Sequence, residues 1–221
     1  MIDVIIFGCG DLAKQVYHYL NASKKFNVIC FTVDKKYINS KYLEGKDIIP
    51  FEDIESKFPA KRYKFITAIG YKNMRIRNKI YNDIKSKGYD FINYIHESVI
   101  INNPINIGSN NLILSNVVIE PNVRIGSNNI IYSNTVIGHD STLGDNNIIS
   151  IGNNIAGFTK IKTGCFIGIG STIINNLTIE DESLIGAGSL IIKSTEKLGL
   201  YTGVPAKKLR EIDSNVGIEI T

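Results

Sequence analysis

Aliphatic side chains recur at every sixth residue through the second half of the chain, from Ile95 to Ile191. The series has no insertion or slip: Ile95, Ile101, Ile107, Ile113, Ile119, Ile125, Ile131, Ile137, Leu143, Ile149, Ile155, Ile161, Ile167, Ile173, Ile179, Ile185 and Ile191. A period of six fits neither the 3.6 residues of an α-helical turn nor the alternation of a half-buried strand. It is typical of a hexapeptide solenoid, a β-helix in which each face is one short strand and one turn.

Two other positions of the repeat support this interpretation. The residue two before the aliphatic is mostly small or modest in size, as at Thr135, Ser141, Asn147, Asn153, Thr159, Cys165, Ser171, Ser183 and Ser189. The residue after it is often glycine, as at Gly108, Gly126, Gly138, Gly144, Gly168 and Gly186. We interpret the Gly and Asn residues as corners, because they tolerate left-handed backbone angles. Each aliphatic is then expected to point inward and to stack on its equivalent 18 residues along the chain.

The first 95 residues follow a different pattern, in which apolar runs alternate with amphipathic stretches. We expect strands over residues 4–7, 27–33, 63–69 and 90–94, a helix that Asp11 caps, and a second helix over residues 73–87. Residues 35–60 are interpreted as a loop with one weak strand and one short helix. Strands that alternate with helices predict a small parallel sheet of the Rossmann type. The chain therefore divides into an α/β domain over residues 1–95 and a β-helix with a short tail over residues 96–221.

A glycine-rich turn follows the first predicted strand. Gly8, Gly10 and Ala13 match the G-x-G-x-x-G/A dinucleotide fingerprint, and Asp34 ends the next strand. The domain has room for only one nucleotide-binding half, but such a turn offers backbone N–H groups to phosphate, and Asp34 is placed for a ribose or base. The alternative, that the glycines only make a tight turn, stays open. The candidate substrate-binding residues are Gly8, Cys9, Gly10, Asp11, Asp34, Lys35, Gly70 and Asn73.

Composition and charge narrow the class of protein. The chain is 43% hydrophobic and 21% charged, with a formal net charge of +4, which suits phosphorylated ligands but is too weak to indicate nucleic-acid binding. Cys9, Cys30 and Cys165 form neither a metal motif nor a disulfide framework. No apolar run approaches the roughly 20 residues that span a bilayer, and the apolar start lacks a charged leader. We therefore expect a cytoplasmic protein with no metal and no membrane span.

Three sequence segments together resemble a known family. They are G-C-G-D at residues 8–11, I-G-H-D-S-T-L-G-D at residues 137–145 and G-V-P-A-K at residues 203–207. Over nearly its whole length the chain resembles the nucleotide-sugar acyltransferases, which include bacillosamine and perosamine N-acetyltransferases and sialic-acid O-acetyltransferases. The resemblance implies a left-handed β-helix, acetyl-CoA as the acyl donor, and a homotrimer with active sites between subunits.

The resemblance also assigns roles within the second segment. It makes His139 the catalytic base, next to Asp140, and it takes an oxyanion donor from the backbone of the next coil, which is Gly157. The chemistry agrees, because an amine that attacks a thioester must lose a proton, and an imidazole oriented by a carboxylate can accept that proton. Among the three histidines, His18 lies within a predicted helix and His96 at the domain junction, so His139 is the one that interrupts a polar corner.

The resemblance places coenzyme A along later coils. The candidate contacts are Gly157, Gly168, Gly170, Gly186 and Gly188, with Lys207, Lys208 and Arg210 for the 3′-phosphate. Simple corner glycines and a solvated basic tail remain the alternatives. The chain differs from many members of the family at two positions that lie near the acceptor sugar in that family. Many relatives have Gly-His where this chain has Asp11-Leu12, and a second His where this chain has Ile148.

The leading hypothesis is an acetyl-CoA-dependent N-acetyltransferase that acts on the amino group of a UDP-, dTDP- or GDP-linked amino-dideoxy sugar. Sugar O-acetylation with the same histidine is a second hypothesis, and a trimeric nucleotide-sugar-binding scaffold without activity is a third. A γ-class carbonic anhydrase is also a left-handed β-helix, but it needs three histidines for zinc. Only His139 lies well inside the solenoid, so we exclude this class.

Overall fold

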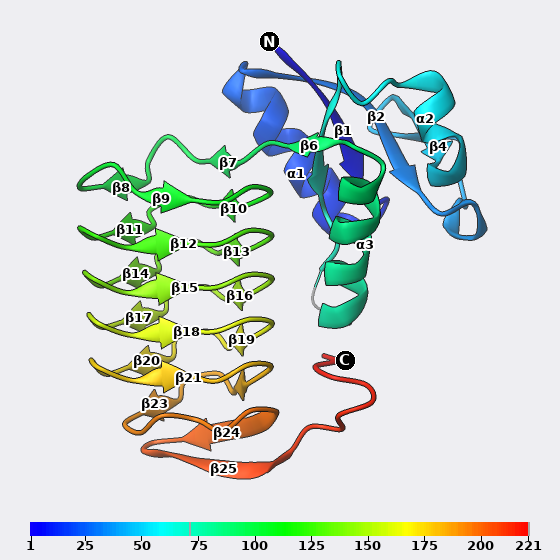
Figure 1. The fold of residues 1–221 in the computed structure, drawn as a ribbon. Coiled ribbons are helices and arrows are strands. Elements are labelled where there is room, and N and C mark those ends of the chain that lie inside the picture. The colour runs from blue at the N-terminus through cyan, green and yellow to red at the C-terminus, as the bar shows by residue number, and fades with distance from the viewer. Residues whose placement is uncertain (71, 221) are drawn as a thin grey trace. The chain divides into compact units, whose positions relative to one another are not determined.

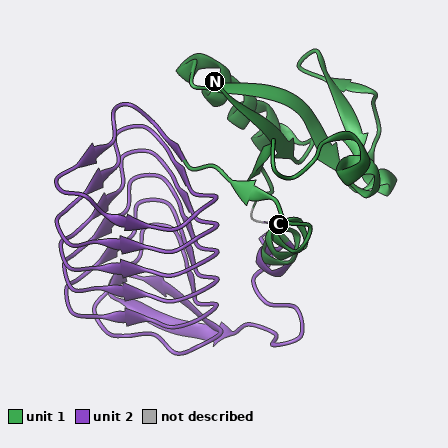
Figure 2. Cartoon of the chain, turned by 45° about the horizontal axis from the view of Figure 1, so that its top comes forward, with its two compact units in different colours: residues 1–70, 77–93 green, residues 71–76, 94–221 purple. Residues whose placement is uncertain are grey.

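The computed structural model describes residues 1–70 and 72–220, and the chain forms two compact units (Figure 2). The first unit comprises residues 1–70 and 77–93, and the second comprises residues 71–76 and 94–221. The division lies two residues before the boundary expected at residue 95. The beginning of helix α3 (Met74–Ser86) groups with the second unit.

The first unit is a six-stranded sheet flanked by helices (Figure 1). The strands lie in the order β3-β4-β2-β1-β5-β6, and all neighbours are parallel except the β3–β4 hairpin. Their bounds are β1 (Ile2–Phe7), β2 (Phe26–Val33), β3 (Tyr42–Leu43), β4 (Lys46–Pro50), β5 (Lys64–Thr67) and β6 (Asp90–Phe91). The helices are α1 (Asp11–Ser23), α2 (Ile54–Lys57), α3, and the 3₁₀ turns η1 (Lys35–Tyr37) and η2 (Phe51–Asp53). The predicted alternation of strands and helices is confirmed.

The chain changes direction across this sheet at β1. It runs from β1 through α1 to β2 on one side, and later returns to add β5 on the other side of β1. The carboxyl ends of β1 and β5 therefore lie side by side, and the Ala68 N–H donates to the Phe7 carbonyl at 2.7 Å. In open α/β sheets ligands bind at such a switch point, outside the carboxyl ends of the strands.

Several details of the first unit differ from the sequence prediction. Residues 35–60 contain two strands, and β4 joins the main sheet because Ile48 is buried beside Phe31 of β2. The expected strand over residues 90–94 is interrupted, and its last residue begins strand β7 of the solenoid. Asp11 does not cap α1: Gly10 occupies the N-cap position, and no side chain of the described residues makes the capping hydrogen bond.

The second unit is a three-faced solenoid whose short strands stack like rungs (Figure 1). Each strand from β7 to β23 has two residues and ends on one predicted aliphatic. They are β7 (Tyr94–Ile95), β8 (Ile100–Ile101), β9 (Asn106–Ile107), β10 (Leu112–Ile113), β11 (Val118–Ile119), β12 (Arg124–Ile125), β13 (Ile130–Ile131), β14 (Val136–Ile137), β15 (Thr142–Leu143), β16 (Ile148–Ile149), β17 (Asn154–Ile155), β18 (Lys160–Ile161), β19 (Phe166–Ile167), β20 (Thr172–Ile173), β21 (Thr178–Ile179), β22 (Leu184–Ile185) and β23 (Leu190–Ile191).

The strands pair in parallel with the strand 18 residues along, as Ile113 does with Ile131. The aliphatics from Ile113 to Ile191 are at most 3% exposed and form one continuous core. The hairpin of β24 (Gly199–Gly203) and β25 (Ala206–Glu211) adds to the sheet that contains β22 and closes that end of the solenoid. The predicted left-handed β-helix is confirmed.

The corners use glycine differently from the prediction. The left-handed residue is the third after each aliphatic from Ile107 to Ile185, in an unbroken series of Asn110, Asn116, Asn122, Asn128, Asn134, Asp140, Asn146, Gly152, Phe158, Gly164, Gly170, Asn176, Glu182 and Gly188. The glycines directly after the aliphatics do not have positive φ. They are required by close packing of successive coils, since a Cβ there would lie 2.3–2.9 Å from atoms of the next coil. At Gly138 that atom is the backbone nitrogen of Gly157, at 2.6 Å.

In the described ranges, no helix is both long enough and apolar enough to cross a lipid bilayer.

Candidate active site

His139 lies on the solenoid corner that follows β14, and its side chain is half exposed. Its Nδ1 lies 2.9 Å from Oδ2 of Asp140. The left-handed backbone of Asp140, with a φ of 57°, belongs to the regular corner pattern. The other carboxylate oxygen of Asp140 accepts a hydrogen bond of 3.0 Å from the amide of Asn122, one coil earlier. Asn122, Asp140 and His139 therefore form one hydrogen-bonded chain that ends at the imidazole.

The electrostatics of this chain favour an ionised Asp140. Its hydrogen bond with His139 lowers the pKa of the Asp140 carboxyl, and the hydrogen bond from Asn122 lowers it further. An ionised carboxylate can only accept at Nδ1, so it selects the tautomer in which Nδ1 carries the proton. The Nε2 lone pair is then the basic position of the ring.

The backbone of His139 is held by a residue that the sequence analysis missed. Oε2 of Glu120 accepts a hydrogen bond of 3.0 Å from the His139 N–H. Glu120 and Asn122 lie on the same corner as His139, one coil before it. The signal was present in the 18-residue register, which places residues 120–122 directly beside residues 138–140.

Gly157 lies against the imidazole of His139 from the next coil. A Cβ at Gly157 would be 2.8 Å from Nε2 and 2.9 Å from Cε1 of that ring, so no larger residue fits without moving the imidazole. Gly157 is buried, and among residues 1–70 and 72–220 no group accepts a hydrogen bond from its N–H. A backbone N–H that has no partner, on a residue in contact with the imidazole, is a candidate donor to an oxyanion.

Phe158 completes the surroundings of the imidazole. Its ring centroid lies 5.0 Å from that of His139, with the two planes at 86°. Phe158 is half exposed and has a left-handed backbone, with a φ of 58°. Its position in the repeat did not mark it as a site residue.

The other candidate glycines lie on a different corner of the solenoid, the one that follows β19 and β22. Gly168 and Gly186 pack closely against the chain that follows. A Cβ at Gly168 would lie 2.5 Å from the Ala187 nitrogen, and a Cβ at Gly186 would lie 2.9 Å from Oγ1 of Thr202. Gly170 and Gly188 are left-handed corner residues, each with a φ of 66°. The structure therefore gives all four a role in the coil and does not bring them together with His139.

The predicted phosphate-binding lysines both lie on β25. The ammonium group of Lys208 donates to Glu196 at 2.7 Å and to Glu211 at 3.2 Å, and these hydrogen bonds raise its pKa. Its charge is therefore already compensated. Lys207 is exposed and points to the opposite face of the strand.

The candidate nucleotide-binding residues of the first unit share the carboxyl edge of its sheet. The glycine-rich turn follows β1, Asp34 and Lys35 follow β2, and Gly70 follows β5. A Cβ at Gly8 would lie 2.7 Å from the Ala68 carbonyl oxygen, so close packing explains this glycine. Gly10 faces open space at the uncapped N-terminus of α1, where backbone N–H groups attract anions.

Contacts of two candidate residues, Lys35 and Asn73, were not foreseen. The carboxylate of Glu52 accepts hydrogen bonds of 3.1 and 3.2 Å from the Lys35 N–H. The side chain of Asn73 caps α3, where its Oδ1 accepts from the Ile76 N–H at 2.9 Å, and its amide donates to Glu219 at 2.5 Å. These two contacts give Asn73 a local structural role.

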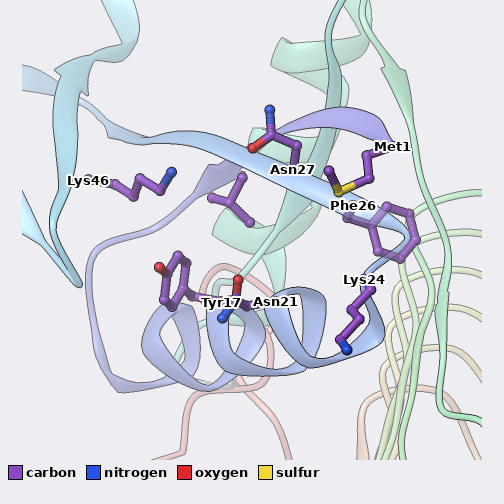
Figure 3. A pocket seen from close by; sticks show the side chains of 8 residues that line it. Met1, Tyr17, Asn21, Lys24, Phe26, Asn27 and Lys46 are labelled. Carbon is purple, nitrogen blue, oxygen red and sulfur yellow. The ribbon is translucent and has the colours of Figure 1, made fainter.

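A surface hollow of about 480 Å³ lies elsewhere on the first unit (Figure 3). Its lining residues are Met1, Tyr17, Asn21, Lys24, Phe26, Asn27, Val28 and Lys46. Phe26 and Asn27 begin β2, whereas Asp34 follows its other end, so this hollow is separate from the predicted nucleotide edge.

The chain matches two family models. Residues 3–84 match the PglD N-terminal domain, and residues 104–139 match the bacterial transferase hexapeptide (six repeats). A search of curated proteins by sequence gave no match.

Solved structures with the same fold cover nearly the whole chain. PerB from Caulobacter crescentus, solved with CoA and GDP-perosamine, is 23% identical over 94% of this chain and 97% of its own, with a TM-score of 0.81. The acetyltransferase domain of PglB from Neisseria gonorrhoeae is 22% identical over 95% and 100%, with a TM-score of 0.85. WeeI from Acinetobacter baumannii is 21% identical over 95% and 100%, with a TM-score of 0.82. The resemblance stated from the sequence is confirmed in its domains and fold: the chain joins a PglD-type N-terminal domain to a left-handed β-helix of transferase hexapeptide repeats.

Proposed function

We propose that this protein is an acetyl-CoA-dependent N-acetyltransferase that acts on the amino group of a nucleotide-linked amino-dideoxy sugar, with His139 as the general base. One observation carries the proposal: the imidazole is bound at Nδ1 by Asp140, and its Nε2 lies against Gly157, a residue whose N–H has no partner among the described residues. The likeness to PerB and to the PglB domain, which was also solved with acetyl coenzyme A, supports the choice of donor and acceptor.

The residues of the corner account for each proton and charge of the transfer. The Nε2 atom of His139 accepts the proton that the sugar amine loses as its nitrogen bonds to the thioester carbonyl carbon. The Gly157 N–H donates to the oxyanion that forms on that carbonyl, and Asp140 stabilises the imidazolium. When the C–S bond breaks, the carbonyl of the N-acetyl sugar re-forms, and the imidazolium returns its proton to the departing thiolate, which leaves as free coenzyme A.

We place the nucleotide at the carboxyl edge of the first unit, around Gly10 and Asp34. The uncapped N-terminus of α1 and the switch point between β1 and β5 support this location. Lys35, which follows Asp34, adds a positive charge at the same edge.

We also propose a homotrimer with His139 facing a neighbouring solenoid, in the cytoplasm. Two large apolar side chains on one corner, Ile151 and Ile169, are 46% and 57% exposed, and they support an association that covers the solenoid faces. Light scattering should give a mass of about 74 kDa, three times the 24.5 kDa chain. A stable monomer at micromolar concentration would contradict the trimer.

A thiol-release assay tests the activity. Acetyl-CoA is offered with UDP-, dTDP- and GDP-linked 4-amino-4,6-dideoxy sugars, and each amino sugar is matched by the sugar with a hydroxyl at the same carbon. Thiol release with an amino sugar, and an added acetyl group on its nitrogen, is the expected result. Release only with the hydroxyl sugars would favour O-acetylation by the same histidine, and binding of sugar without release would favour a scaffold.

A further inference from the structure

The residue types at the left-handed corner positions single out Phe158. Fourteen consecutive hexads have a left-handed residue, and eleven of these residues are Asn or Gly. These two residue types adopt the conformation at the lowest cost in free energy, whereas a bulky side chain there is a genuine outlier. Phe158 is the only aromatic residue in this series.

The other two exceptions each have a specific partner for the side chain. Asp140 binds the imidazole of His139. Glu182 forms two hydrogen bonds with the guanidinium of Arg75, at 2.7 and 3.0 Å. A side chain that departs from Asn or Gly at this position is therefore associated with a definite contact, and for Phe158 that contact is the ring of His139.

Ordinary packing does not account for the phenyl ring. Phe158 is 50% exposed, so burial in the core does not explain it. Its backbone N–H donates to the His139 carbonyl at 2.9 Å, but the equivalent bond recurs at Asp140 and Asn176 with other side chains. Strained backbone conformations that persist without a folding reason cluster at functional sites.

The ring lies where it can restrict the imidazole. The half-exposed His139 side chain is bound by one hydrogen bond, at Nδ1, and rests on Gly157. The phenyl ring also contacts the imidazole, with its centroid 5.0 Å from that of His139 and its plane nearly perpendicular. Catalytic geometry tolerates little displacement, and a group misplaced by about 1 Å can cost a factor of about 100 in rate.

We propose that Phe158 is a positioning residue, whose ring together with Gly157 restricts the imidazole of His139 so that Nε2 is directed at the reacting amine. The proposal rests on the proposed role of His139 as the base. The left-handed backbone at Phe158 is then tolerated because the phenyl ring is needed beside His139.

The test replaces the ring by the side chain that the corner favours. Phe158→Asn should keep or raise the melting temperature, because Asn relieves the left-handed backbone, and it should lower kcat about tenfold with both KM values unchanged. Phe158→Tyr retains the ring and should restore kcat to within about twofold of wild type. Asn176→Gly, at the equivalent corner one coil later, is the matched control and should not alter kcat.

A spectroscopic readout separates positioning from stability. In ¹⁵N-labelled protein, the His139 ring nitrogens should report one tautomer, protonated at Nδ1, and a mixture of tautomers in Phe158→Asn. Light scattering should give the same mass for both proteins.

Several results would overturn the proposal. The first is an unchanged kcat in Phe158→Asn. The second is a rise in KM for acetyl-CoA at unchanged kcat, which would make the ring a substrate contact. The third is loss of the oligomer in this variant, which would make the ring a subunit contact. If wild-type protein transfers no acetyl group, or if His139→Asn is fully active, then the proposed function fails instead.

Discussion

Replacing Gly157 by alanine changes a single methyl group at the point where the imidazole of His139 rests. The added Cβ would lie 2.8 Å from Nε2, whereas ordinary van der Waals contact begins at 3.4 Å. The imidazole must therefore retreat by about 0.6 Å. Its hydrogen bond to Asp140, at 2.9 Å, cannot survive that retreat unchanged in length and direction.

The expected loss of rate follows from this displacement. A shift of about 1 Å can cost a factor of about 100, so we expect kcat of Gly157→Ala to fall between about 10- and 100-fold. The backbone of Gly157 does not have positive φ, so alanine is not strained there and the melting temperature should change little. The thiol-release assay gives kcat, and thermal unfolding by circular dichroism gives the melting temperature.

Gly152→Asn is the matched control for this variant. Gly152 is a left-handed corner residue with a φ of 71° and open space around its Cβ direction, and Asn occupies the same position in other coils. It should retain wild-type activity. If Gly157→Ala is folded and its kcat stays within twofold of wild type, then the imidazole does not rest on Gly157 in the working enzyme, and the reasoning is refuted.

Three further predictions concern other parts of the account. Because the pKa of Asp140 lies below its ordinary 3.8 in the folded protein, its charge stabilises the fold above about pH 4, and this stabilisation is lost as the pH falls through the folded value. The difference in stability between wild type and Asp140→Asn, from urea unfolding, should therefore shrink as the pH falls from 5 to below about 4; a difference that grows over this range would contradict this sign. Burial raises the pKa of Cys30 and Cys165 to about 12, whereas Cys9 is partly exposed, so a disulfide reagent at pH 8 should modify Cys9 first. The sugar nucleotide should slow this reaction, and equal rates with and without it would argue against a site at this loop. Gly10→Val should raise KM for the sugar and leave KM for acetyl-CoA unchanged, whereas an equal loss of both would indicate a folding defect.

The solenoid could be predicted in detail because its stability depends on a local rule. Each face of each coil needs one inward aliphatic, so the period of six predicted the position of every short strand from Ile95 to Ile191. The reason for the glycines was wrong, because the sequence does not show how closely successive coils approach. Gly138 is required by the backbone of Gly157, which is 19 residues away in the chain.

The first unit was harder to predict between residues 35 and 60. Strand β4 contains Lys46, Asp47 and Pro50, and only Ile48 among its residues is buried, so its sequence carries little of the pattern of a central strand. It is recognised only through its pairing with β2, a contact between segments far apart in sequence.

Only part of the candidate site could be predicted from the sequence. His139 stood out as a residue type that a corner does not need, and the resemblance pointed to Asp140 as its acidic neighbour. Glu120, Asn122 and Phe158 did not, because their relation to His139 crosses from one coil to another. Applying the 18-residue register to the sequence would have brought these neighbours together.

The most direct test of the account is the rate of His139→Ala with acetyl-CoA and the best amino-sugar nucleotide from the panel. Loss of a positioned base should lower kcat by about 10² to 10⁴, with little change in KM, because proton transfer belongs to the transition state. The protein should keep its melting temperature, since the side chain is half exposed. A folded His139→Ala protein whose kcat lies within tenfold of wild type would show that His139 is not the base, and would contradict the account at its centre.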